Sequence, residues 1–206
     1  MADLKRTIGA LLAATIVAVV AAAPAQAGPL AESAQNCDDP ASAQVFLRWL
    51  DLAQYVRAPG GDAESSNGWR LADGARIVAG NEPWKVGGAS DDASLRLPSG
   101  SRATTAAMCV GIGHPTVRFF ARRTSGSLLS TLKVEVLFEG LGGAINSLPI
   151  GVVLGGGTWQ PTLPFPVVAS LLPLLPGEQT PVAFRFTPAT GDWQVDDVYV
   201  DPWKAR

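Results

Sequence analysis

Histidine and cysteine are scarce in this 206-residue chain, which has one His and two Cys. Zinc centres are built from several Cys or His ligands, so the composition does not support one. A serine hydrolase is equally unsupported, because His114 is the only imidazole base and no Gly-x-Ser-x-Gly elbow is present. His114 precedes Pro115 and is expected to be a turn residue that hydrogen-bonds locally.

Concentrated positive charge is also missing. The formal net charge is −2, and the only basic doublet after residue 27 is Arg122-Arg123. Nucleic acids and anionic membrane surfaces bind concentrated basic patches, so neither is an expected partner. The glycines at 155–157 are not followed by Gly-Lys-Ser/Thr, which excludes a phosphate-binding loop.

A long apolar run occurs at the start of the chain. Lys5 and Arg6 precede the apolar residues 8–23, and Ala25-Gln26-Ala27 follows them. This pattern predicts a Sec-type signal peptide, residues 1–27, cleaved after Ala27 to release a secreted protein. A retained membrane anchor is the alternative, but the run is short for a span. We expect a lead-in over residues 28–42 and one domain over residues 43–206.

The two cysteines, Cys37 and Cys109, fall in the exported part of the chain. Exported thiols are usually oxidised, so a disulfide between them is expected. A cross-link that closes a loop of this length is worth about 4 kcal/mol in the chain-entropy account. The alternative, a Cys nucleophile paired with His114, would require one of the thiols to stay free.

Short segments of alternating apolar and polar residues make up most of the chain, separated by Gly and Pro. This period of two predicts many strands joined by tight turns, and therefore an all-β, single-domain β-sandwich of the jelly-roll type. The segment at 43–56 fits both a helical and a strand pattern, and its neighbours favour a strand. The Pro-rich stretch at 161–174 is expected to be an edge or core strand broken by prolines. The clearest alternating segments are GWRLADGARIVAG, ASLRL, TVRFFARR, TLKVEVLFE and TPVAFRFTP.

The alternation slips by one residue in the last such segment, GDWQVDDVYVDP. Trp193 and Val195 share one face, whereas Val198 and Val200 fall on the other. A slip of this kind predicts a β-bulge at Asp196-Asp197. Two adjacent carboxylates inside a strand are costly to bury unless they are paired or bind a cation.

Three stretches in this order, GGDAESSNGWRLADGARIV, SLRLPSGS and WQVDDVYVDP, resemble the galactose-binding-like jelly roll of many carbohydrate-binding modules. More narrowly, the chain is similar to secreted proteins of actinobacteria. The resemblance covers Glu64 to Pro202 and implies a structural Ca²⁺ held by Glu64 and by Asp196 or Asp197. One departure is Ala63, where the modules usually carry an aromatic residue. The alternative is that the Asp pair only accepts hydrogen bonds from turn amides.

The resemblance also implies a glycan ligand, which needs an exposed aromatic side chain for stacking. Trp84, in a polar loop, and Trp159, after three glycines, are the candidates, with packing as the alternative role. Trp69 and Trp193 begin strands and are expected to lie in the core. The predicted function is a non-catalytic, secreted module that binds a glycan of the cell envelope or an environmental polysaccharide. A structural or protein-interaction domain is the alternative, and a polysaccharide lyase or hydrolase is less favoured.

Overall fold

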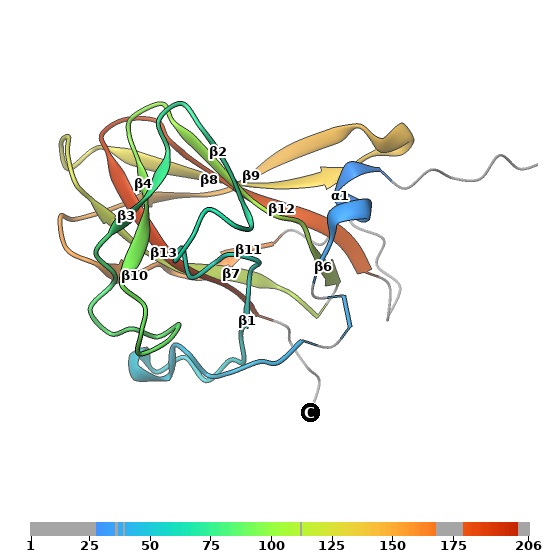
Figure 1. Ribbon diagram of the computed structural model, residues 1–206, viewed down its shortest axis with the longest axis horizontal. Helices are drawn as coiled ribbons and strands as arrows, with labels where there is room; N and C mark the ends of the chain where they lie inside the picture. Colours follow the sequence, from blue (N-terminus) through green and yellow to red (C-terminus); the bar gives the residue numbers. More distant parts are fainter. Residues whose placement is uncertain (1–27, 36, 39, 112, 168–178, 202–206) are drawn as a thin grey trace, which may run out of the picture.

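The protein folds as two antiparallel β-sheets packed face to face (Figure 1). The computed structural model describes residues 28–201 except 36, 39, 112 and 168–178. The predicted signal peptide and part of the Pro-rich stretch therefore lie outside the described residues. The prediction of an all-β sandwich is confirmed.

In the described part of the chain, strands make up nearly all of the regular structure, with one short helix and two 3₁₀ turns. In chain order the elements are α1 (Pro29–Ser33), η1 (Leu47–Trp49), β1 (Val56–Arg57), β2 (Trp69–Ala72), β3 (Arg76–Ala79), β4 (Ala93–Leu97), β5 (Arg102–Thr105), β6 (Met108–Gly111), β7 (Thr116–Arg123), β8 (Thr131–Glu139), η2 (Leu141–Gly143), β9 (Ile145–Leu154), β10 (Gln160–Pro161), β11 (Phe165–Pro166), β12 (Gln179–Pro188) and β13 (Trp193–Asp201). None of the helices in the described residues has the length and apolar character needed to cross a membrane.

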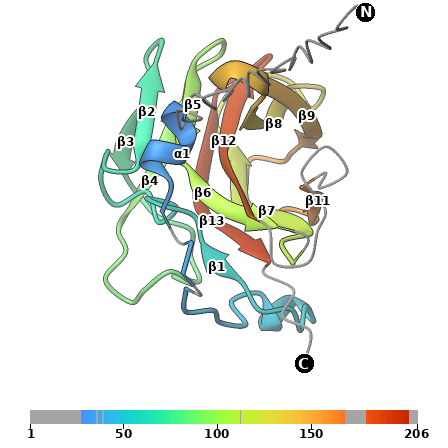
Figure 2. The same cartoon turned by 90° about the vertical axis from the view of Figure 1, so that its right-hand side faces the viewer.

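The chain passes repeatedly between the two sheets, as in a jelly roll (Figure 2). The seven-stranded sheet has the order β10-β7-β13-β4-β3, with β1 paired to β13 and β11 paired to β7. The six-stranded sheet has the order β2-β5-β12-β8-β9, with β6 paired to β12. The last strand, β13, therefore lies inside the seven-stranded sheet, between β7 and β4.

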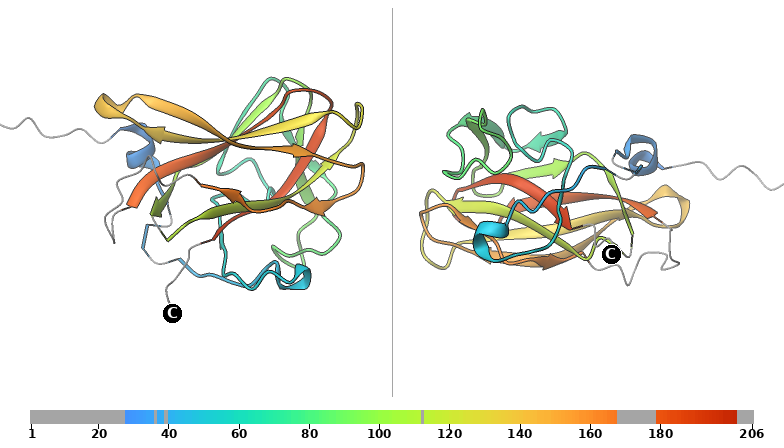
Figure 3. Two further views of the ribbon diagram at one scale, coloured as in Figure 1. Left: turned by 180° about the vertical axis from the view of Figure 1, so that it is seen from behind. Right: turned by 90° about the horizontal axis from the view of Figure 1, so that it is seen from below.

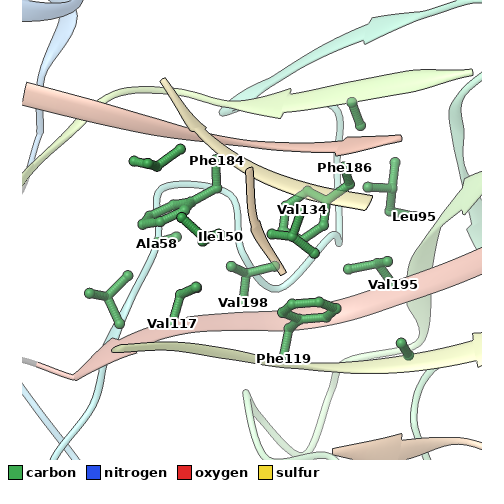
Figure 4. Packing of buried hydrophobic residues seen from close by; sticks show 14 of the residues in the cluster. Ala58, Leu95, Val117, Phe119, Val134, Ile150, Phe184, Phe186, Val195 and Val198 are labelled. Atoms are coloured by element: carbon green, nitrogen blue, oxygen red, sulfur yellow. The ribbon is translucent and has the colours of Figure 1, made fainter. Parts of the chain in front are cut away.

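The main core fills the space between the sheets (Figure 4). Phe184 and Phe186 of the six-stranded sheet point toward Phe119 and Val195 of the seven-stranded sheet, and all four are fully buried. Alternate residues of a strand face the same side, so the period of two in the sequence places these side chains inward. The expected core position of Trp193 is confirmed, whereas Trp69 is half-buried at the edge of the core.

The predicted bulge in β13 is confirmed. Asp196 pairs with Phe120 and Tyr199 pairs with Arg118, so β13 has one residue more than β7 between these two pairs. Asp197 has a positive φ of 51° there. The extra residue resets the alternation, and the valines on both sides of the bulge point into the same core.

The prediction of a strand over 43–56 is wrong for most of that segment. It contains η1, and only Val56 belongs to a strand. Figure 3 shows the segment crossing outside the seven-stranded sheet. Phe46 is fully buried there and packs on Phe120 and Tyr199, which point away from the main core. The apolar residues of the segment therefore cover the outer face of the sheet and do not extend it.

Two local predictions are confirmed, the disulfide and the turn at His114. Cys37 and Cys109 form a disulfide with a Cα–Cα distance of 4.8 Å, which ties the lead-in to β6. The Gly111 N–H donates to His114 Nδ1 at 3.0 Å, so His114 closes a local turn.

Candidate functional site: a buried carboxylate cluster behind an open cleft

Four carboxyl groups gather where the β13 bulge meets the loop between β3 and β4. Asp196 and Asp197 come from the bulge, and Glu82 and Asp91 come from the loop. Their exposed fractions are 1 %, 0 %, 1 % and 7 % in that order. Carboxyl groups are rarely buried so completely unless they have partners, so the partners decide what the cluster can do.

Backbone amides satisfy two of the four groups. Asp196 accepts hydrogen bonds from the N–H groups of Glu82 at 3.1 Å and Asp197 at 2.9 Å. Glu82 accepts from the N–H groups of Trp84 and Val86, the latter at 2.6 Å. Asp196 thus has the structural role that the sequence left open as an alternative, and Glu82 closes its own loop.

Asp197 and Asp91 lack such partners. Neither oxygen of Asp197 accepts a hydrogen bond of normal geometry from the described residues, and Oδ2 of Asp91 accepts none either. The groups that come nearest to bonding Asp197 are the Gly87 N–H and the Glu82 side chain. Both side chains point at Gly87, where a Cβ would collide with Oδ1 of Asp197 and Oδ2 of Asp91. Glycine at this position lets two buried carboxylate oxygens approach the same point.

The electrostatics of the cluster are unfavourable for negative charge. Burial raises the pKa of Asp196 to about 9, and the charge of Asp197 adds to the shift. Burial and then the charge of Glu82 raise the pKa of Asp197. The pKa of Asp91 is raised by burial and by the nearby Glu64. At neutral pH Asp196 and Asp197 must therefore hold protons or share a cation.

The donor set fits a calcium ion. Ca²⁺ takes six to eight hard oxygen ligands from carboxylates, backbone carbonyls and water, and the carboxylates of Asp197 and Asp91 both face Gly87, where they offer oxygens of this kind. Among the described residues, no three His, Cys, Asp or Glu side chains lie close enough together to hold a metal ion. A bound ion would therefore take the rest of its ligands from backbone carbonyls or water.

The sequence identified Asp197 but missed Asp91 and Gly87. The only available signal was a Gly87-Gly88 pair shortly before Asp91 in a polar loop. Glu64, the other predicted metal ligand, lies near Asp91 but its Oε1 accepts hydrogen bonds from the N–H groups of Asp92 and Ala93, both at 3.0 Å. A direct contact of Glu64 with a metal stays a prediction.

The bulge is hydrogen-bonded to a loop that lines an open cleft. The Ala58 N–H donates to the Val198 carbonyl and the Val198 N–H donates to the Gly61 carbonyl, each at 2.9 Å. The loop continues from there around a cleft of about 520 Å³, whose opposite wall is the lead-in. Polar groups of Gln35, Arg57, Asp62, Ser65 and Asn67 line this cleft. The carboxylate cluster thus lies behind one wall of the cleft.

The two tryptophans predicted to bind a ligand lie elsewhere, outside the seven-stranded sheet. There Trp159 belongs to a second aromatic cluster, and Trp84 packs against it. The other members of the second aromatic cluster are Phe46, Tyr55, Phe120 and Tyr199. Trp159 is 7 % exposed, with the Arg122 guanidinium 4.9 Å from its ring centroid. Trp84 is half-buried and meets Trp49 edge to face at 5.0 Å. The structure brings neither of them to the polar cleft.

Comparisons with known proteins identify no family for this chain. No family model matches it, and no curated protein matches it. The narrower similarity to secreted actinobacterial proteins stays a prediction.

Solved structures give distant likenesses. One is a Clostridium thermocellum endo-1,4-β-D-xylanase 10B fragment with CBM22-1 and GH10 modules, complexed with xylohexaose; the identity is 13 %, the TM-score is 0.48, and the match covers 72 % of this chain but 28 % of that one. Another is the CBM22-1 xylan-binding domain of Paenibacillus barcinonensis Xyn10C, with 11 % identity, a TM-score of 0.47, and 75 % and 97 % of the two chains covered. A third is the C-terminal CBM6 of LamC, a laminarinase of Zobellia galactanivorans, with 9 % identity, a TM-score of 0.44, and 71 % and 98 % covered.

All three contain carbohydrate-binding modules, the class of domain that the sequence motifs resemble. At this level of similarity no binding residue can be transferred from them to this chain. A ligand site has to be argued from the residues of the chain itself.

Proposed function

We propose that this protein is a secreted, non-catalytic carbohydrate-binding module whose ligand is a neutral glycan held in the cleft between the lead-in and the loop after β1. The chemistry of the cleft carries the proposal. Among the described residues that line it, the charged side chains Arg57 and Asp62 pair with each other at 3.1 Å. The remaining polar side chains, Gln35, Ser65 and Asn67, offer amide and hydroxyl groups. Such groups suit an uncharged ligand rich in hydroxyls, and the volume of about 520 Å³ lies within the usual range of ligand sites.

A structural Ca²⁺ held by Asp197 and Asp91 is the second part of the proposal. The unpartnered oxygens of these two carboxylates support it. The ion would supply positive charge between two buried acids and so join the loop between β3 and β4 to the bulge. Because the bulge is hydrogen-bonded to the loop that lines the cleft, the ion would also order one wall of the glycan site.

Binding to a panel of soluble and insoluble neutral polysaccharides tests the glycan site. Asn67→Ala and Gln35→Ala each remove one exposed amide from the cleft, and we expect each to weaken retention about five- to twenty-fold, as for the loss of one or two hydrogen bonds. Gln160→Ala removes an exposed amide from β10, away from this cleft, and should bind like the unmodified protein.

Trp84→Ala distinguishes binding in the cleft from binding at the aromatic site that the sequence predicts. Loss of retention in Trp84→Ala, with Asn67→Ala unaffected, would place the sugar at the second aromatic cluster. Absence of retention by correctly folded protein, with Ca²⁺ and with chelator, would favour the alternative of a structural or interaction domain.

A further inference from the structure

The short helix α1 lies on the outer face of the six-stranded sheet, against β12 (Figure 2). Its first turn is held by one carboxylate of β8, because the N–H groups of Leu30 and Ala31 both donate to Glu139 Oε1. A helix of five residues has almost no stability of its own. The position of α1 therefore depends on this contact and on its packing.

Gly28, the residue before α1, is pressed against the same carboxylate. A Cβ on Gly28 would lie 2.5 Å from Cδ and Oε2 of Glu139 and 2.6 Å from Oε1. On another side, the Cα of Gly28 is 3.7 Å from the position a Cβ of Gly143 would take. The Gly28 carbonyl accepts a hydrogen bond from the Glu32 N–H at 3.0 Å. The backbone of Gly28 is thus fixed beside a negative charge.

Gly28 is also the residue that follows the predicted cleavage point. We propose that cleavage after Ala27 creates an α-ammonium group on Gly28 that pairs with Glu139 and fastens α1 to the sheet. Hydrolysis of the Ala27–Gly28 peptide bond adds one water, leaves a carboxylate on Ala27 and frees an amine on Gly28, which takes a proton near neutral pH. Before cleavage the same nitrogen is an uncharged amide. The proposal rests on the secretion step of the proposed function but not on its glycan site.

The contact with Glu139 also holds α1 at a second cleft. Leu30 and Ser33 of α1 form one wall of a cleft of about 290 Å³, and Trp69, Arg70 and Thr104 form the facing wall. If α1 detaches, this wall is lost and Trp69 gains exposure. Removal of the signal peptide would then strengthen, through the ion pair, a surface that the packing of α1 already forms.

Hydrogen exchange of the Leu30 and Ala31 amides measures directly how firmly α1 is held on the sheet. Two chains are compared, one that begins at Gly28 and one that begins at Ala27, so that they differ by one residue and by the position of the ammonium. All described elements lie after residue 27, so both chains contain the whole core. We expect about two- to five-fold greater protection in the chain that begins at Gly28, as for a half-exposed ion pair.

Glu139→Gln in both chains is the control for a merely structural role. It keeps an oxygen that can accept from the two amides but removes the charge, so the difference between the chains should disappear. An ion pair raises the pKa of the ammonium in the folded state. Its stabilisation is complete below the pKa of the unfolded form and is lost as the pH rises through the pKa of the folded form. The extra protection should therefore also fade as the pH rises through about 8. Equal protection in the two unmodified chains, or a difference that persists in Glu139→Gln, overturns the proposal.

Mass spectrometry of the exported protein tests the cleavage point separately. An N-terminus other than Gly28 overturns the proposal, whereas the glycan-binding result stands or fails independently.

Discussion

Chelating calcium should make the stability of the domain fall steeply as the pH rises. The folded state holds Asp197, a proposed calcium ligand, with a pKa raised from 3.8 to about 8, because the group is buried and lies near the charge of Glu82. The unfolded chain releases the same proton near pH 4. Between these two values the folded state binds more protons than the unfolded state, so each unit of pH rise lowers the free energy of unfolding.

The size of the effect follows from the shift. One such group contributes about 1.4 kcal/mol per pH unit, so from pH 5 to pH 8 the chelated domain should lose about 4 kcal/mol. The raised pKa of Asp196 acts in the same direction. Since domains are stable by about 5–15 kcal/mol, this loss is a large part of the total. For a domain of this size it corresponds to a fall in melting temperature of about 10 °C.

Thermal unfolding at several pH values, with chelator and with Ca²⁺, measures the loss. Calcium should remove most of the fall, because the ion replaces the protons between the carboxylates. Asp197→Asn keeps the shape of the side chain and removes one charge, so it should raise the melting temperature of the chelated domain at pH 8 and abolish the calcium response. Identical pH profiles with and without Ca²⁺ in the unmodified protein would refute the cation site.

Gly87→Ala should destabilise the domain by about 1–3 kcal/mol, because the new Cβ overlaps two carboxylate oxygens. Gly156 faces open space, so Gly156→Ala should change the melting temperature little. Equal shifts in the two variants would show that Gly87 has no special role. Replacing Cys37 and Cys109 together with Ser should lower the free energy of unfolding by about 4 kcal/mol in denaturant titrations, and no change would contradict a stabilising disulfide. Phe46→Ala should cost about 3–5 kcal/mol in the same titrations, since the ring is fully buried on the outer face of the seven-stranded sheet. A loss below about 1 kcal/mol would mean that this segment is only loosely attached.

The strands and the bulge could be predicted because both depend on local alternation. A strand with one buried face repeats every two residues, and the slip between Val195 and Val198 could be read as an added residue without knowledge of the partner strands. The sheets in which these strands pair depend on contacts far apart in the sequence. Those pairings became visible only in the folded chain.

The segment at 43–56 shows the limit of the same argument. Its apolar spacing is what a strand would have, but the residues that it covers, Phe120 and Tyr199, come from β7 and β13. Both strands are buried on two faces, and nothing in the segment itself indicates that it would supply the second cover. A short apolar run buried by tertiary contacts cannot be assigned from its own pattern.

The candidate site was half predictable for a related reason. Asp197 was visible as a charge in an apolar strand, which is unusual wherever it occurs. Asp91 and Gly87 lie in a polar loop, where charge and glycine are ordinary, and they become notable only because the fold brings them to Asp197. The identity of the second carboxylate therefore depends on the fold, not on the local sequence.

Asp197 is, for the purposes of packing, a surplus residue. A β13 shorter by this one position would alternate regularly, with Trp193, Val195, Val198 and Val200 still directed to the core. The shorter strand would also avoid a positive φ and a buried acid. A chain that keeps a dispensable residue in its most buried strand carries a local instability that the architecture does not require, and the proposed cation would relieve that instability.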